Sequence, residues 1–89
     1  MRVSIHAIQR FRQRTGTNKT NKEIETRLLE LFSKCKTARF KRKEDEVMAL
    51  LNHHFQIANY FIRSNIVFVV SDDTILTIHN NEAKRWVEN

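Results

Sequence analysis

Apolar residues follow two different spacings along this chain, helical in its first part and extended in its last. Residues 66–70 are apolar without a break and mostly β-branched, with polar residues on both sides. Such a run is typical of a central strand that is buried on both faces. The polar turn 71–73 predicts that residues 74–79 return as its antiparallel neighbour. A period of two then places three residues of the returning strand on one face: Ile75, Thr77 and His79.

The first third of the chain has the spacing of amphipathic helices. We expect one helix over residues 4–15, beginning at a serine that suits an N-cap and ending before the single glycine, Gly16. We expect a second over residues 20–36, because Thr20-Asn21-Lys22-Glu23 has the sequence of a capping box. The apolar stripe of the second helix includes Cys35, which is therefore expected to be a small core residue.

The middle and the end of the chain carry weaker patterns. Residues 38–42 are basic and alternate weakly, as in a charged edge strand. Residues 44–53 begin with acids and contain alanine and leucines, which favours a short third helix, with a strand over residues 47–51 as the alternative. The polar tail 80–89 is expected to form a helical turn that docks Trp86 on the sheet.

These patterns together predict a fold of the α+β class. An N-terminal helical pair packs on a small antiparallel β-sheet, accompanied by the short third helix and the C-terminal helical turn. A chain of 89 residues is long enough for one modest hydrophobic core, so we expect a single domain over residues 1–89.

The charge of the chain indicates its class of partner. Sixteen Lys and Arg residues against ten Asp and Glu give a formal net charge of +6 and a pI near 10.0. This balance favours a polyanionic partner such as RNA or DNA, although solubility alone also explains it. Of the two we expect RNA, in keeping with the ribonuclease hypothesis below. One cysteine excludes an internal disulfide, and no apolar run has the length of a signal peptide or a membrane span, so we expect a cytoplasmic protein without a membrane partner.

Nucleotide-binding and metal-binding motifs are absent from the sequence. The single glycine excludes a glycine-rich phosphate loop, and the four histidines lack cysteine partners or a zinc-binding spacing. We therefore expect no cofactor and no metal.

Histidine, arginine and hydroxyl residues form the candidate site. Metal-independent cleavage of RNA needs a general acid or base and cations that stabilise the phosphate, and histidine and arginine suit these tasks. On the first helix His6, Arg10 and Arg14 follow one another at steps of four, beside the buried face. The other candidates are Tyr60, Thr77 and His79, and a basic segment for substrate binding, Arg39, Lys41 and Arg42. Each of these residues also has an ordinary structural explanation.

The two ends of the chain carry a resemblance. Residues 6–14 read His-Ala-x-x-Arg-Phe-x-x-Arg, and residues 67–79 contain Val-Phe-Val-Val followed by Ile-Leu-Thr-Ile-His. Together they resemble small phage- and prophage-type domains related to the RelE and barnase-type ribonuclease toxins. The resemblance implies a helical pair on an antiparallel sheet, with His6 as general acid or base, Arg10 and Arg14 as phosphate clamps and Thr77 as an orienting hydroxyl. It covers about a third of the chain, and the middle of the chain takes no part in it.

Three hypotheses on function follow. The first is a metal-independent ribonuclease, a toxin or mobile-element effector that acts on RNA. The second is a non-catalytic phage or host regulatory protein that binds nucleic acid or an acidic protein partner; an antitoxin is the partner expected for a toxin. The third is a homodimeric interaction module. The first requires that His6, Arg10 and Thr77 share one cleft.

Overall fold

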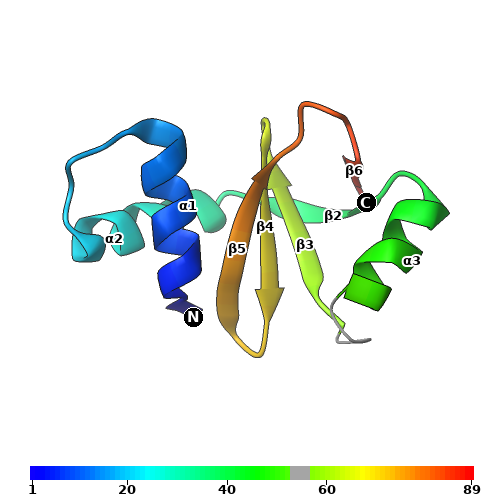
Figure 1. Cartoon of the computed structure of the whole chain (residues 1–89), viewed down its shortest axis with the longest axis horizontal. Helices are drawn as coiled ribbons and strands as arrows, with labels where there is room; N and C mark the ends of the chain where they lie inside the picture. The colour runs from blue at the N-terminus through cyan, green and yellow to red at the C-terminus, as the bar shows by residue number, and fades with distance from the viewer. Residues whose placement is uncertain (53–56) are drawn as a thin grey trace.

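The structure, a computed structural model, describes residues 1–52 and 57–89. Its elements in chain order are β1 (Arg2–Val3), α1 (Ile5–Thr15), α2 (Asn21–Phe32), β2 (Lys36–Phe40), α3 (Lys43–Asn52), β3 (Asn59–Arg63), β4 (Ile66–Ser71), β5 (Thr74–Asn80) and β6 (Trp86–Glu88). Figure 1 shows α1 and α2 at one end of the molecule, α3 at the other, and the strands between them. The expected α+β class is confirmed.

The strand β4 lies at the centre of the sheet, as its unbroken apolar run predicts. The described residues form a six-stranded sheet in the order β1-β5-β4-β3-β2-β6. β4 pairs antiparallel with β5 on one side and β3 on the other, and Val67 to Val70 are all buried. The sheet is mixed and not purely antiparallel, because β1 runs parallel to β5.

The strand β2 is not the edge strand that its basic residues predict. It spans residues 36–40 instead of 38–42 and pairs antiparallel with β3 on one side and with β6 on the other. The C-terminal segment therefore covers the edge of β2. The charged side chains of β2 alternate with side chains that face inward. A basic segment can therefore form an interior strand of the sheet.

Both N-terminal helices begin at the caps that the sequence contains. The hydroxyl of Ser4 accepts a hydrogen bond from the Ala7 amide at 3.0 Å, and Gly16 ends α1 at a φ of 64°, where a residue without a Cβ is unstrained. At the start of α2, Thr20 and Glu23 form the expected capping box. The Glu23 carboxylate accepts bonds from the backbone and the side chain of Thr20, which lower its pKa.

The second helix ends earlier than expected, at Phe32. The chain turns directly after this residue and enters β2 at Lys36, where the sequence pattern predicts the helix to end. The Phe32 ring packs edge-on against Phe61 and Phe68, with centroids 4.9 and 5.7 Å apart, and this packing draws the chain toward the sheet. Cys35 lies beyond the helix and is half-buried, and burial raises the pKa of its thiol.

The main core lies between the two N-terminal helices and one face of the sheet. This arrangement confirms the expected packing of the helical pair. Its buried residues come from α1, α2, β4 and β5: Ala7, Ile8, Ile24, Leu28, Phe68, Val70, Ile75 and Ile78.

The opposite face of the sheet is strongly curled. The ring of His79 on β5 lies 5.4 Å from that of Trp86 on β6, although β4, β3 and β2 separate these strands in the hydrogen-bonding order. Neighbouring strands are about 4.8 Å apart, so a flat sheet would hold the two rings far from each other. The curled face instead closes around a second, smaller core of Ala38, Ile62, Val67 and Trp86.

The C-terminal segment docks Trp86 on the sheet as expected, but as a strand and not as a helical turn. Residues 86–88 form β6. The buried Asn81 side chain donates a hydrogen bond to the Trp86 carbonyl at 2.9 Å and accepts one from the Trp86 amide at 3.1 Å. Because both polar groups of that backbone are satisfied by one side chain, the segment stays extended.

A β-bulge changes which side chains of β5 share a face. Val69 lies opposite Thr77, but Val70 lies opposite Ile75, so Leu76 is an extra residue that faces no partner on β4. Ile75 therefore belongs to the helical side of the sheet, whereas Thr77 and His79 point to the curled side. The expectation that these three residues share one face is wrong for Ile75.

The third helix is confirmed over Lys43–Asn52, and the alternative strand over residues 47–51 is excluded. Residue 53 of the expected helix lies outside the described residues. None of the described residues of α3 is buried, and Val47, Met48 and Leu51 are exposed. Figure 1 shows the helix beside β2 and β3, at the end of the molecule remote from α1.

Candidate nucleic-acid interface

The start of α1 is attached directly to the bulge of β5. The Ser4 amide donates to the Ile75 carbonyl at 2.9 Å, and the Ser4 hydroxyl donates to the Leu76 carbonyl at 2.7 Å. The same hydroxyl caps the helix through the Ala7 amide. The Ser4 side chain therefore fixes α1 along β5, and the line along which helix and strand meet forms the rim.

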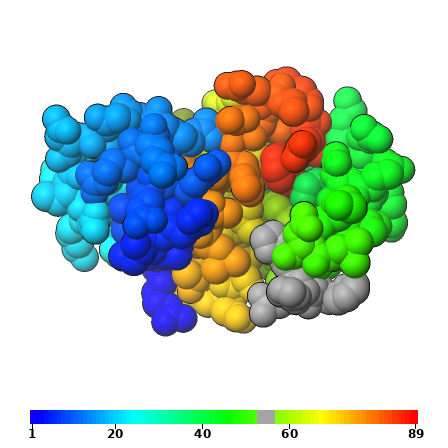
Figure 2. All heavy atoms as spheres, viewed as in Figure 1, coloured from blue at the N-terminus to red at the C-terminus, as the bar shows by residue number. Residues whose placement is uncertain are grey.

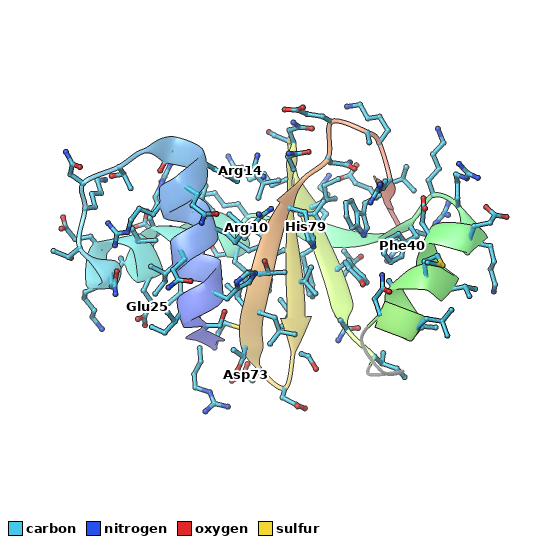
Figure 3. The ribbon with its side chains drawn as sticks, viewed as in Figure 1. Arg10, Arg14, Glu25, Phe40, Asp73 and His79 are labelled. Carbon is cyan, nitrogen blue, oxygen red and sulfur yellow. The ribbon has the colours of Figure 1, made fainter. Side chains whose placement is uncertain are left out.

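The candidate residues of α1 lie along this rim. Arg10 is half-buried, whereas His6 and Arg14 are exposed. Figure 3 shows Arg10 and Arg14 on the side of α1 next to β5, with His79 on the far side of that strand. The spacing of four residues therefore brings two guanidinium groups to the same helix flank, as the sequence predicts.

On β5, Thr77 and His79 are both half-buried and belong to the curled side of the sheet. The His79 ring stacks on Trp86 with an interplanar angle of 12°. This stacking orients the imidazole, because the indole is itself held in the smaller core. The structure thus places a hydroxyl and an oriented imidazole on one strand, on the side of the sheet opposite the core that α1 forms.

An aromatic cluster continues from His79 across the curled face. The Phe40 and Tyr60 rings lie 4.8 Å apart, edge to face, and the Phe40 and Trp86 ring centroids lie 5.2 Å apart.

The Nε1 of Trp86 is buried, and among the described residues no acceptor bonds to it. A buried donor without a partner costs about 1–3 kcal/mol. Sequence reasoning did not include Phe40 or Trp86 in the site, although both are aromatic residues on otherwise polar segments.

The second basic group does not lie with the first. Arg39 is on β2, and Lys41 and Arg42 follow it in the turn to α3, all three exposed. In the sheet, β4 and β3 separate β2 from β5, and Figure 1 shows the turn into α3 at the opposite end from α1. The basic candidate residues therefore form two groups, one beside α1 and one beside α3.

A cavity of about 390 Å³ lies at the end of the molecule that carries α3, and Arg39 of the second basic group is part of its lining. Its walls come from the inner side of α3, from β2 and from the residues leading into β3. Tyr60 lines it, and burial, followed by the nearby Glu46 carboxylate, raises the pKa of its hydroxyl. Glu46 was not among the predicted site residues, because an acid in a first helical turn has an ordinary structural role.

The two ends of the molecule frame an open surface. Figure 2 shows α1 and α3 protruding on either side, with atoms of β5 exposed between them. Within residues 1–52 and 57–89, no group of three or more His, Cys, Asp or Glu side chains is arranged to hold a metal ion. No helix in the described part of the chain is long and apolar enough to span a membrane.

Comparisons with known proteins leave the chain without a family assignment. No family model, no curated protein sequence and no solved structure matched it.

Proposed function

We propose that this chain binds RNA along the surface between α1 and α3 and cleaves it, without a metal ion, where α1 meets β5. One observation carries the proposal: Arg10, Arg14 and His79 come from two elements packed on each other and lie around the same strand (Figure 3). The formal charge of +6 supports a polyanionic partner. The resemblance of both chain ends to ribonuclease toxins supports the same reaction.

The proposed reaction is transfer of the phosphodiester to the neighbouring ribose hydroxyl. A general base removes the proton of the 2′-hydroxyl, whose oxygen bonds to phosphorus while the bond to the 5′-oxygen breaks. A general acid supplies the proton that the departing 5′-oxygen needs. The products are a 2′,3′-cyclic phosphate and a 5′-hydroxyl end.

Each candidate residue has one task in this reaction. His79, oriented by Trp86, and His6 on the exposed flank of α1 are the proton-transferring pair. Arg10 and Arg14 bind the phosphate oxygens and stabilise the charge that develops on them. The Thr77 hydroxyl, two residues from His79 on the same face, orients the scissile phosphate.

Cleavage in the presence of a chelator tests this proposal. Single-stranded and structured RNAs are incubated with the wild type and with His6→Ala, His79→Ala, Arg10→Ala and Thr77→Ala variants shown to be folded. We expect cyclic phosphate ends from the wild type and rates lower by about 10²–10⁴-fold in the histidine variants. An all-deoxy strand, which lacks the 2′-hydroxyl, should remain intact.

Lys22→Ala is the matched control, because it removes a positive charge from an exposed position on α2, outside the rim. Its rate should equal that of the wild type. RNA that is bound but intact with every folded protein would refute cleavage and leave a non-catalytic RNA-binding protein. RNA that is neither bound nor cut would refute the whole proposal.

A further inference from the structure

The cavity beside α3 is large enough for a small molecule, and the cleavage proposed at α1 and β5 does not use it. Its volume of about 390 Å³ lies within the range of about 300–1,000 Å³ that is usual for ligand sites. Apolar side chains form most of the wall: Ala38, Phe40, Ala49, Leu50 and Ile57. These side chains offer contact area to a ligand but no hydrogen bonds.

Two aromatic rings form a corner of the cavity. Phe40 and Tyr60 both line it, with ring centroids 4.8 Å apart and ring planes that meet at 67°. Both residues are half-buried, so their rings keep surface that a ligand can contact. The Trp86 ring, 5.2 Å from that of Phe40, holds the corner against the smaller core. The face of an aromatic ring carries partial negative charge, and aromatic cages use such faces to bind ammonium groups.

A carboxylate lies beside these rings. Glu46 of α3 lines the cavity; burial raises the pKa of the Tyr60 hydroxyl, and the nearby Glu46 carboxylate raises it further. Within residues 1–52 and 57–89 no ion pair joins Glu46 to a cation, whereas Glu44 on the same helix is paired with Arg42 at 3.3 Å. Glu46 is also exposed, so its negative charge is accessible to a cationic ligand.

One cationic residue, Arg39, also belongs to the lining of the cavity. Successive side chains of a strand point to opposite faces, so Arg39 leaves β2 on the face opposite to Ala38 and Phe40, which pack in the smaller core. The guanidinium therefore starts from the other side of the strand than the aromatic corner. Distant charges of the chain are screened over about 8 Å at physiological ionic strength. The nearby carboxylate of Glu46 consequently dominates the charge at the corner.

The apolar wall determines which kind of cation suits the corner. A primary ammonium group carries three N–H donors, and donors that are removed from water without a partner weaken binding. A quaternary ammonium group has no donor, so its methyl groups can pack on apolar side chains at no such cost. Its charge still interacts with aromatic rings and with a carboxylate. The corner therefore favours an alkylated ammonium group.

We propose that this cavity binds an organic cation through a quaternary ammonium group, which contacts the rings of Phe40 and Tyr60 and is neutralised by Glu46. The site goes beyond the proposed function, because neither step of the cleavage needs it. The same group is present in choline-like small molecules and in a trimethylated lysine of a peptide.

Titration with choline and with its neutral isostere, the alcohol in which a carbon atom replaces the nitrogen, tests the site. Amide and methyl resonances of Ala38, Ala49 and Ala58, which line the cavity, are followed. Choline should reach half-saturation at a concentration about tenfold below that of the isostere, because the rings and the carboxylate attract the charge and not the shape. Ethanolamine, a primary ammonium ion, should bind more weakly than choline. Equal half-saturation for choline and either compound, or no shift at these alanines, would overturn the inference.

Three variants connect the binding with the corner. Glu46→Gln keeps the shape of an exposed side chain and removes its charge, so choline binding should weaken about tenfold while that of the isostere stays unchanged. Phe40→Leu, once shown to be folded, keeps an apolar wall without a π-face and should weaken choline binding about fivefold. Glu44→Gln is the matched control on α3, outside the cavity lining, and should change the affinity less than twofold. If the Glu46→Gln protein binds choline as tightly as the wild type does, the inference fails.

A short peptide that contains trimethyl-lysine, titrated in the same way, distinguishes the two sources of the group. Half-saturation below that of choline would assign the site to a methylated peptide, and half-saturation above it would assign the site to a small molecule. Both outcomes are separable from the proposed function. Choline binding by a protein that leaves RNA intact would keep this site and refute the cleavage, whereas cleavage of RNA without a preference for choline over its isostere would do the reverse.

Discussion

Replacing Ser4 tests whether α1 is held to the sheet by the bulge of β5. The Ser4 hydroxyl accepts from the Ala7 amide at 3.0 Å and donates to the Leu76 carbonyl at 2.7 Å, so Ser4→Ala removes a helix cap and an inter-element hydrogen bond together. The cap contributes about 1 kcal/mol and the second bond about 1 kcal/mol. We therefore expect the free energy of unfolding to fall by about 2 kcal/mol, a large share of the total for a domain of this size.

Two comparison variants separate the contributions. Ser4→Asp keeps an acceptor for the helix amide but has no proton to donate to Leu76, so it should lose about half as much stability as Ser4→Ala. Thr20→Ala removes the cap of α2, whose hydroxyl bonds only to its own capping box, and should cost about 1 kcal/mol.

Urea unfolding followed by the fluorescence of the single tryptophan, Trp86, measures all three variants. The midpoint should shift while the slope stays constant, because the surface exposed on unfolding does not change. In thermal unfolding, a loss of about 2 kcal/mol corresponds to a lowering of Tm by about 8–16 °C. A Ser4→Ala protein no less stable than Thr20→Ala, or a Ser4→Asp protein as stable as the wild type, would refute the reasoning.

Four further outcomes are expected. Phe68→Ala, at a side chain with no exposed surface, should cost about 3–5 kcal/mol in urea unfolding, and a cost under 1 kcal/mol would contradict the central position of β4. Burial and Glu46 raise the pKa of Tyr60 above its ordinary 10.0, so the folded state keeps this proton longer than the unfolded state and stability should fall as pH rises above that value. Glu46→Gln should lower the pKa of Tyr60 in a titration of the phenolate absorbance, and an unchanged or raised pKa would mean that the carboxylate is not beside the hydroxyl. RNA affinity should fall linearly on a log–log plot against salt, and Arg10→Ala and Arg14→Ala should each reduce the slope by about one, whereas an unchanged slope would remove these arginines from the phosphate contacts.

Local sequence determined the elements and the centre of the sheet. The caps at Ser4 and Thr20 and the stop at Gly16 act through bonds and φ angles within a few residues, so they are readable without any knowledge of the fold. The unbroken apolar run of β4 is equally local, because a strand buried on both faces has no polar side to show. The flank of α1 that carries Arg10 and Arg14 follows from helical geometry alone.

Tertiary structure decided what the segments pair with and which side chains meet. The bulge at Leu76, which separates Ile75 from Thr77 and His79, depends on the register with β4 and on the bond from Ser4, neither of which a period of two contains. The tail became β6 because Asn81 and the edge of β2 satisfied its backbone.

The curl of the sheet had the largest effect on the candidate site. It brought Trp86 against His79 across strands that are not neighbours, and it left the cavity of Phe40, Glu46 and Tyr60 beside α3. Such contacts arise from the twist and closure of the whole sheet, which no short stretch of sequence encodes. The sequence therefore supplied the chemically capable side chains and the helix flank, and the long-range packing decided which of them became neighbours.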